Sequence, residues 1–334
     1  MKRKSTHLTI TPAAFQKALL DYFDTHKRSL PWREARSAYK VWLSEIMLQQ
    51  TTVRTVIPYF QRFLHHYPTV KDLARADEQD VLHLWQGLGY YSRARNLLKC
   101  AKVITAEHNG QFPATAKELE ALPGIGPYTA AAIAAIYFKE PVPVVDGNIE
   151  RIVARLLTLP KPPKQEKLTI KAFIKDVLSE TRPGDFAEAM MDLGSGICTP
   201  KNPKCDICPL ASFCQAFQTH TTEKYPVKAT KTKRPHKTGT AYIIEDSEDK
   251  ILLQQRPSNG LLGGLWQPPV IGWDNSVPLN NAIEALLKNN QTTPLGTVEH
   301  IFSHFSLALD VQHIQLQKPL PHAFNSSDLP PLPT

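Results

Sequence analysis

Residues 122–129 read Leu122-Pro-Gly-Ile-Gly-Pro-Tyr-Thr129 and lie between two stretches whose apolar residues recur at helical spacing. Glycines at positions 124 and 126 allow backbone amides to turn outward where the next helix begins, and the positive end of that helix favours an anion. Such a turn suits a DNA phosphate and does not depend on base sequence. An ordinary turn between two helices also contains Gly-x-Gly, so Gly124 and Gly126 alone leave both interpretations open.

The helical pattern continues on both sides of this turn, from residue 13 to about residue 215. Apolar side chains recur at helical spacing in 15–23, 43–47 and 81–85, and short segments rich in glycine and proline separate such stretches. No internal repeat is visible. The sequence therefore predicts a mostly α-helical first domain over residues 1–223.

The composition changes at Lys224. Residues 224–237 contain six basic side chains, two prolines and no acid, which is typical of a linker. Residues 238–334 are expected to form a separate small α+β domain. Its expected elements are a hairpin of 240–244 with 251–255, a helix over 279–289 and a strand over Leu307–Leu316.

Four cysteines are crowded into seventeen residues, with the spacing Cys198-x6-Cys205-x2-Cys208-x5-Cys214. Four thiolates this close together can enclose one metal centre without ligands from distant parts of the chain, and the density makes four unrelated cysteines implausible. A tetrahedral zinc ion and an iron–sulfur cluster can both be held by four thiolates, so spacing alone does not choose between them.

The charge of the 334-residue chain is uneven. Residues 1–237 carry 35 basic and 22 acidic side chains, a net charge of +13, whereas residues 238–334 carry a net charge of −5. A polyanion such as nucleic acid is therefore attracted to residues 1–237, although a basic soluble surface has the same signature. No run approaches the roughly 20 apolar residues of a membrane helix, and no apolar signal core follows the basic start. We expect a cytoplasmic enzyme.

Two acidic residues are candidates for catalysis. Asp146 follows the apolar pair at 144–145 and precedes a helical stretch, where an N-cap is the simplest interpretation. Glu45 lies in an amphipathic helical stretch, where it can be an ordinary surface charge. Considered together, they match glycoside chemistry, in which one acid protonates a leaving group and another supports an oxocarbenium-like centre.

Six motifs follow one another along residues 13–220, and their order is far more specific than any one of them. They are Leu30-Pro-Trp-Arg33, Ser44-Glu-Ile-Met-Leu-Gln-Gln-Thr51, Gly87-Leu-Gly-Tyr-Tyr91, the 122–129 turn, Val145-Asp-Gly-Asn148 and the four-cysteine loop. This set resembles the adenine DNA glycosylases of the MutY type. The resemblance implies a helix–hairpin–helix glycosylase domain with a [4Fe–4S] cluster on Cys198, Cys205, Cys208 and Cys214, followed by a small Nudix-like α+β domain.

The resemblance also assigns a role to individual residues. Glu45 would protonate the adenine ring, which needs a raised pKa such as burial supplies, and Asp146 would stabilise the sugar cation or trap it covalently. The expected substrate-binding residues are Leu30, Trp32, Arg33 and Glu188 around the adenine, Tyr90 as a wedge in the duplex, Gln49 as a filler of the base stack, and Tyr128 and Asn148. The expected partner is double-stranded DNA with an adenine opposite 8-oxoguanine or guanine, bound by a monomer.

Tyr128 separates this family from its relatives. In endonuclease-III-like enzymes the matching position is a lysine that forms a Schiff base and permits strand cleavage, whereas a phenol cannot form an imine. Base removal without strand cleavage is therefore expected. The alternatives are an endonuclease-III-like pyrimidine glycosylase and lyase, which Tyr128 disfavours, and a non-enzymatic DNA-binding protein that holds zinc.

Residues 238–334 resemble the Nudix-like domain of the same family, but more weakly than residues 13–220 resemble the glycosylase domain. Its few glutamates lack the paired spacing that holds magnesium in active Nudix hydrolases, so hydrolysis is not expected. The resemblance implies that Phe302, Ser303 and His304 contact 8-oxoguanine, although a turn between strands explains this tripeptide equally simply. The sequence ends at 329–334 without the closing helix that we expect for the family, which indicates a shortened domain.

Overall fold

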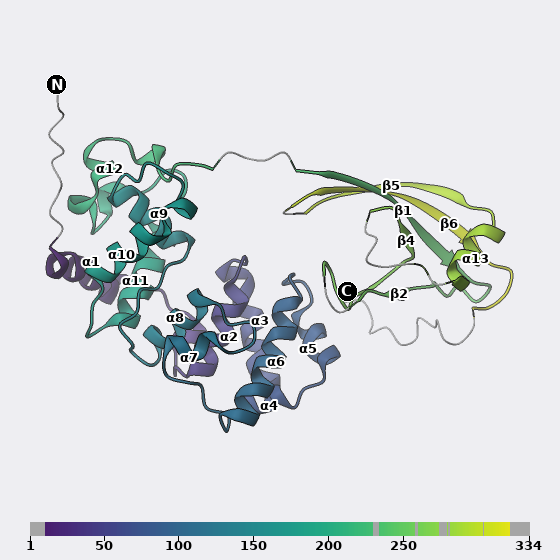
Figure 1. The fold of residues 1–334 in the computed structure, drawn as a ribbon, viewed down its shortest axis with the longest axis horizontal. Helices are drawn as coiled ribbons and strands as arrows, with labels where there is room; N and C mark the ends of the chain where they lie inside the picture. Colours follow the sequence, from purple (N-terminus) through teal and green to yellow (C-terminus); the bar gives the residue numbers. More distant parts are fainter. Residues whose placement is uncertain are drawn as a thin grey trace. The chain divides into compact units, whose positions relative to one another are not determined.

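A computed structural model describes residues 11–229, 234–257, 260–273, 279, 281–302 and 304–320 of the chain. Its contacts divide the chain into two units, residues 1–230 and 231–334 (Figure 1). The division falls within the basic stretch 224–237 that we expect to be a linker. Ser303 and the segment 321–334, which includes the expected C-terminal shortening, lie outside the described residues.

The first unit is helical throughout its described part. Several helices begin at a side chain that accepts a backbone amide hydrogen, as Ser37, Thr52, Thr115 and Asp146 do. The helices are α1 (Pro12–His26), α2 (Ala38–Leu48), α3 (Val53–His66), α4 (Val70–Ala74), α5 (Glu78–Trp85), α6 (Ser92–Glu107), α7 (Ala116–Glu120), α8 (Pro127–Ile136), α9 (Gly147–Leu156), α10 (Lys167–Val177), α11 (Pro183–Gly196) and α12 (Gln215–Gln218), with 3-10 turns at Pro31–Arg33, Pro163–Gln165, Cys205–Ile207, Ala211–Phe213 and Thr222–Lys224.

Two hydrophobic cores divide these helices into two lobes (Figure 1). One core is built from α2 to α8, and the other from α1 with α9, α10 and α11. Helix α8 is buried along most of its length, and α11 contacts both α8 and α9. A Cβ at Gly184 would meet the backbone of Ile136 at 2.7 Å, so glycine is needed where α11 approaches α8. Helix α11 therefore joins the two lobes.

The second unit contains a four-stranded sheet in the order β4-β1-β6-β5 and a two-stranded sheet of β2 with β3. Strand β1 pairs with β6 in parallel over ten residues and with β4 antiparallel, while β5 and β6 form an antiparallel hairpin. The elements are β1 (His236–Glu245), β2 (Gln254–Gln255), β3 (Trp266–Gln267), β4 (Val270–Ile271), α13 (Asn281–Asn289), β5 (Thr293–Ile301) and β6 (Ser306–Gln315).

The expected hairpin of 240–244 with 251–255 is wrong for most of its length. One bridge joins Glu245 to Ile251, and then the chain diverges so that 254–255 pair with 266–267 instead. One edge of β1 pairs with β6 along the whole strand, and on the other edge β4 takes Thr240 and Ala241, where the local partner was expected. The helix expected over 279–289 and the strand expected over 307–316 are present as α13 and β6.

We find no helix in the described part of the chain that is long and apolar enough to cross a membrane.

Candidate active site

A cavity of about 880 Å³ lies where the end of α2 faces the N-terminus of α9, and we call it the main cavity. Glu45 and Tyr128 contribute to its wall, and so do Asp146 and Asn148. These residues come from three of the six motifs, and Glu45 lies more than 80 positions before the others in the sequence. The fold therefore brings both candidate acids to one cavity, as the glycoside interpretation requires.

Glu45 is a buried carboxyl group, 6% exposed, near the end of α2. Its Oε2 accepts a hydrogen bond of 2.7 Å from the Tyr128 hydroxyl. Burial raises the pKa of Glu45 to about 7, and the negative charges of Asp146 and Glu188 act in the same direction, while the Tyr128 hydrogen bond opposes them. A carboxyl group in this state can both hold and release a proton near neutral pH, as a general acid must.

Asp146 is the N-cap of α9 and is half-buried. Its Oδ1 accepts from the backbone N–H of Ile149 and its Oδ2 accepts from Nδ2 of Asn148, both at 2.8 Å. The N-cap interpretation and the catalytic interpretation therefore apply to the same side chain. Two hydrogen-bond donors at the N-terminus of the helix therefore fix the orientation of the Asp146 side chain in the wall of the main cavity.

A chain of hydrogen bonds links Asp146 to the cysteine loop, which the sequence analysis did not predict. Oδ1 of Asn148 accepts from Nη2 of Arg151 at 2.8 Å, and Nε of Arg151 donates to the Cys198 carbonyl at 2.7 Å. Arg151 also donates to the carbonyl of Gly194, where a Cβ would meet Asn148 at 2.5 Å. The i to i+3 spacing of 148 and 151 on one helix face is the signal that could have revealed this link.

A second, smaller pocket of about 40 Å³ adjoins the main cavity, and Glu45 lines both. The four residues expected around the adenine, Leu30, Trp32, Arg33 and Glu188, all line this smaller pocket. It is too small for a purine as it stands, since its volume is that of a few water molecules at most. A base that reaches these residues from the main cavity must therefore displace side chains.

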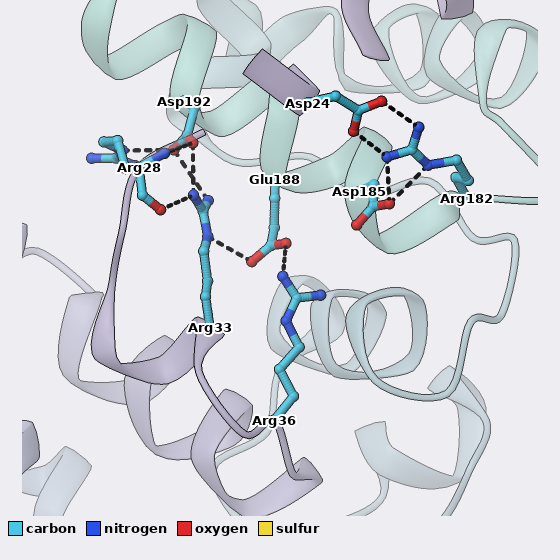
Figure 2. Close-up of polar contacts among 8 residues, drawn as sticks. All are labelled: Asp24, Arg28, Arg33, Arg36, Arg182, Asp185, Glu188 and Asp192. Carbon is cyan, nitrogen blue, oxygen red and sulfur yellow. Dashed lines mark hydrogen bonds and ion pairs between the residues drawn. The ribbon is translucent and has the colours of Figure 1, made fainter. Parts of the chain in front are cut away.

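Arginines and carboxylates form a buried network behind this pocket (Figure 2). Arg33 donates to Glu188 through Nε at 2.9 Å and to both oxygens of Asp192 at 2.7 and 3.1 Å. Arg28 also binds Asp192, and Arg36 binds the other oxygen of Glu188. Although burial opposes ionisation, the hydrogen bonds and charges of Arg33 and Arg28 hold the pKa of Asp192 below its usual value. The network ties the segment around the 3-10 turn Pro31–Arg33 to α11.

A separate arginine contact fastens α1 to α11. Arg182 donates to both oxygens of Asp24 at 2.9 and 2.6 Å and to Asp185 at 2.8 Å, and Figure 2 shows it apart from the Arg33 network. Arg182 and Asp24 are each more than a third exposed, so this contact adds little to the free energy of unfolding.

The residues expected to contact DNA lie in turns. Gly124 has a φ of +73°, and a Cβ there would meet Asn96 at 2.6 Å, so the turn requires glycine; Gly126 is the N-cap of α8. Tyr90 is 43% exposed with a φ of +50°, in the turn before α6. Gln49, the C-cap of α2, lines the main cavity and donates to Oγ1 of Thr129 at 3.2 Å.

The four cysteines line one small cavity of about 20 Å³ together with Arg155. Burial raises the pKa of the Cys208 thiol to about 12, so its thiolate form needs compensation from positive charge. Four thiols that face one cavity, with two arginines against their loop, fit a cluster whose thiolates make it an anion.

Phe302 and His304 lie in the turn between β5 and β6, as the alternative interpretation of this tripeptide predicts. The backbone N–H of Phe302 donates to the carbonyl of Phe305, and the two rings stack with centroids 4.7 Å apart. Phe305 in turn stacks on Trp273, whereas His304 is exposed. Stacked aromatic rings therefore support the turn, and the polar side chain of His304 stays accessible to a partner.

Three family models match the chain. The model of the HhH-GPD superfamily base excision DNA repair proteins matches residues 43–175, that of the iron-sulfur binding domain of endonuclease III matches residues 198–214, and that of the NUDIX domain matches residues 240–333. With the four thiols on one cavity, the second match makes the cysteine loop the site of a [4Fe–4S] cluster, which confirms the predicted cofactor.

Relatives named adenine DNA glycosylase align over most of the chain. The Homo sapiens protein is 35% identical, and the match covers 92% of this chain and 68% of that relative. The protein of Buchnera aphidicola subsp. Acyrthosiphon pisum is also 35% identical, and the match covers 92% of this chain and 88% of that relative. The Arabidopsis thaliana protein is 37% identical over 90% of this chain, which spans 56% of the length of that relative.

Solved structures resemble the first unit. A thermostable thymine-DNA glycosylase superposes with a TM-score of 0.57 at 25% identity and covers 62% of this chain and 97% of its own. An endonuclease III in a non-covalent DNA complex superposes with a TM-score of 0.53 at 21% identity and covers 63% of this chain and 98% of its own. At that identity, the similarity shows a shared fold and nothing more. The predicted fold class, a helical helix–hairpin–helix domain followed by a small Nudix-like domain, is confirmed.

Proposed function

Because this chain belongs to the adenine DNA glycosylase family, we propose that it removes adenine from double-stranded DNA in which the adenine is mispaired with 8-oxoguanine or guanine. The reaction is hydrolysis of the N-glycosidic bond, without cleavage of the backbone. The observation that carries this proposal is the pair of carboxyl groups on one cavity, Glu45 with a pKa of about 7 and Asp146 with two hydrogen-bond donors.

Binding begins with the charge of the first domain. Its net positive charge attracts the duplex, and the outward amides of the 122–129 turn suit a phosphate. The adenine must leave the base stack to reach Glu45, which costs a few kcal/mol and least at a mispair. We assign the space that the adenine leaves to Tyr90, which is exposed in its turn, and to Gln49, which lines the main cavity.

The two acids have different roles in the cleavage of the N-glycosidic bond. Glu45 gives its proton to a ring nitrogen of adenine, the bond between that base and C1′ breaks, and the electron pair leaves with the base. The sugar is left as an oxocarbenium-like cation, which the Asp146 carboxylate stabilises. Water adds to C1′, and its proton passes to the Glu45 carboxylate, which restores the acid.

Tyr128 supports a glycosylase that leaves the strand intact. Its hydroxyl occupies the wall of the main cavity and donates to Glu45. Burial and the nearby carboxylates raise the pKa of Tyr128 well above its usual value, so it stays a neutral phenol. It provides no amine to attack C1′, and no imine with the sugar can form at this position.

The bound [4Fe–4S] cluster supplies a cross-link between four points of the loop, and no step of the base removal runs through it. The chain from Cys198 through Arg151 and Asn148 to Asp146 makes the loop part of the support of the catalytic carboxylate. In the second unit, we assign contact with 8-oxoguanine to the turn that carries Phe302 and His304.

Defined duplexes test the proposal. Oligonucleotides that pair adenine with 8-oxoguanine, guanine or thymine are labelled on the adenine strand, incubated with the protein and analysed with and without alkali. We expect alkali-dependent breaks at the adenine of the first two duplexes and none with thymine. Breaks without alkali, or release of a damaged pyrimidine in place of adenine, would identify an endonuclease-III-like lyase instead. A His304→Ala variant should lose its preference for 8-oxoguanine over guanine.

A further inference from the structure

Arg155 in α9 is one of the most deeply buried charged side chains of the described residues, with 1% of its surface exposed. Its guanidinium reaches two segments at once. On the cysteine loop, Nη1 lies 3.2 Å from Sγ of Cys198 and 2.8 Å from the carbonyl oxygen of Thr199. Beyond that loop, Nε lies 3.1 Å from the carbonyl oxygens of both Thr222 and Tyr225.

The partners of Arg155 differ from those of the other buried arginines. Arg33 faces two carboxylates, which balance its charge inside the protein. Among the described residues, the hydrogen bonds of Arg155 end on carbonyl oxygens and on the Cys198 sulfur, and none ends on a carboxylate. A buried guanidinium is costly unless an anion compensates it, and the four thiolates of the cluster are the anion that its position offers.

The second partner segment leads toward the second unit. Thr222–Lys224 form a 3-10 turn in which the amides of Lys224 and Tyr225 donate to Thr221 and Thr222. The carbonyls of Thr222 and Tyr225 point to the same Nε, so the path of this turn depends on the placement of one guanidinium. The basic stretch that joins the units begins here, at Lys224.

We propose that Arg155 is a positioning residue that couples the iron–sulfur cluster to the Thr222–Tyr225 turn. Its N–H groups donate to the Cys198 thiolate of the bound cluster, and the cluster charge holds the guanidinium at the depth from which Nε orders the turn. Loss of the cluster removes the compensating anion, and the turn then loses its anchor while the two helical cores remain. The inference does not depend on the substrate.

Hydrogen–deuterium exchange on the full chain tests this coupling without any DNA. In the cluster-loaded protein, Arg155→Met should speed exchange of the amides of Lys224 and Tyr225 about tenfold or more, as expected for a locally opened turn. The reduction potential of the cluster should shift downward, because a hydrogen bond to sulfur stabilises the reduced, more negative form. Arg182→Met, which removes a comparable set of hydrogen bonds far from the cysteines, is the matched control and should change neither quantity.

Removal of iron from the wild-type chain by a chelator gives a second measurement, which stands even if Arg155→Met fails to fold. Exchange at Lys224 and Tyr225 should again rise about tenfold, while α8, in the other core, keeps its slow exchange as a sign that the fold persists. A turn that stays equally protected in the iron-free wild type overturns the coupling. An Arg155→Met protein with wild-type exchange and potential overturns the role of Arg155.

Discussion

The two candidate acids lie on opposite elements of the main cavity and in different environments. On α2, Glu45 is buried and receives one hydrogen bond from a neutral phenol, whereas at the N-terminus of α9 Asp146 is half-buried, with a backbone and an amide donor. Burial raises the pKa of Glu45 to about 7, whereas two hydrogen-bond donors orient Asp146 at the start of a helix. The surroundings of each carboxyl group, more than its residue type, therefore suit Glu45 to the role of acid and Asp146 to the role of counter-ion.

Removal of either carboxyl group has the largest expected effect. Glu45→Gln deletes the proton donor and Asp146→Asn deletes the negative charge, while both keep the size of the side chain. Each should lower single-turnover release of adenine by about 10³-fold or more, near the upper range for a positioned acid or a preorganised charge. Rates are measured on an adenine:8-oxoguanine duplex with enzyme in excess, alongside binding of the same duplex, which should change little.

Glu120→Gln is the matched control for these variants, since Glu120 is an exposed glutamate on α7. It should release adenine at the wild-type rate. A wild-type rate in either Glu45→Gln or Asp146→Asn would show that the corresponding wall takes no part in the chemistry.

The buried acid should also make both activity and stability depend on pH. Because the pKa of Glu45 is about 7 in the folded protein and near 4.5 in the unfolded chain, the folded state binds the proton more tightly. The stability that this provides is fully present below pH 4.5 and is lost as the pH rises through 7, by about 3 kcal/mol in total. Adenine release should decline over the same upper range, as the proton donor ionises.

Urea unfolding at pH 5 and pH 8.5 measures this effect. Glu45→Gln carries no ionisable group, so it should be more stable than the wild type at pH 8.5, by up to about 3 kcal/mol, with much less advantage at pH 5. Glu120→Gln should show the same difference from the wild type at both pH values. If the Glu45→Gln advantage does not grow with pH, Glu45 is ionised at little cost and cannot be the proton donor.

The support of Asp146 offers a smaller perturbation of the other wall. Arg151→Met removes the donor that fixes the Asn148 amide, so Asp146 keeps its charge and loses part of its orientation. We expect adenine release to fall about tenfold, the effect of one charged hydrogen bond. Arg75→Met, at an arginine whose side chain is 76% exposed, should leave the rate unchanged. A full rate in Arg151→Met would mean that the N-cap contact with Ile149 alone orients Asp146.

The sequence predicts which residues form the site better than it predicts the contacts between them. The motifs single out Glu45, Tyr128 and Asp146 on three segments, and all three line the main cavity. The pairing of Arg33 with Asp192 and that of Arg151 with Cys198 could not be foreseen, because the partners lie 159 and 47 positions apart and long-range pairs leave no local pattern. The same reason applies to strand β1, whose antiparallel partner β4 lies about 30 positions away and takes the place of the local hairpin at Thr240 and Ala241.

The smallest expected effect concerns the hydroxyl that touches the acid itself. Tyr128→Phe removes one hydrogen-bond donor from the Glu45 carboxylate and leaves the ring in the cavity wall. That hydrogen bond lowers the pKa of Glu45, so its loss should move the upper limb of the pH–rate profile to higher pH, with a rate change of only a few-fold at neutral pH. The profile is measured by single turnover from pH 5.5 to 9. A shift to lower pH would mean that the hydroxyl accepts from a protonated Glu45 rather than donating to it, and the proton of the acid would then be shared with Tyr128 before it reaches the base.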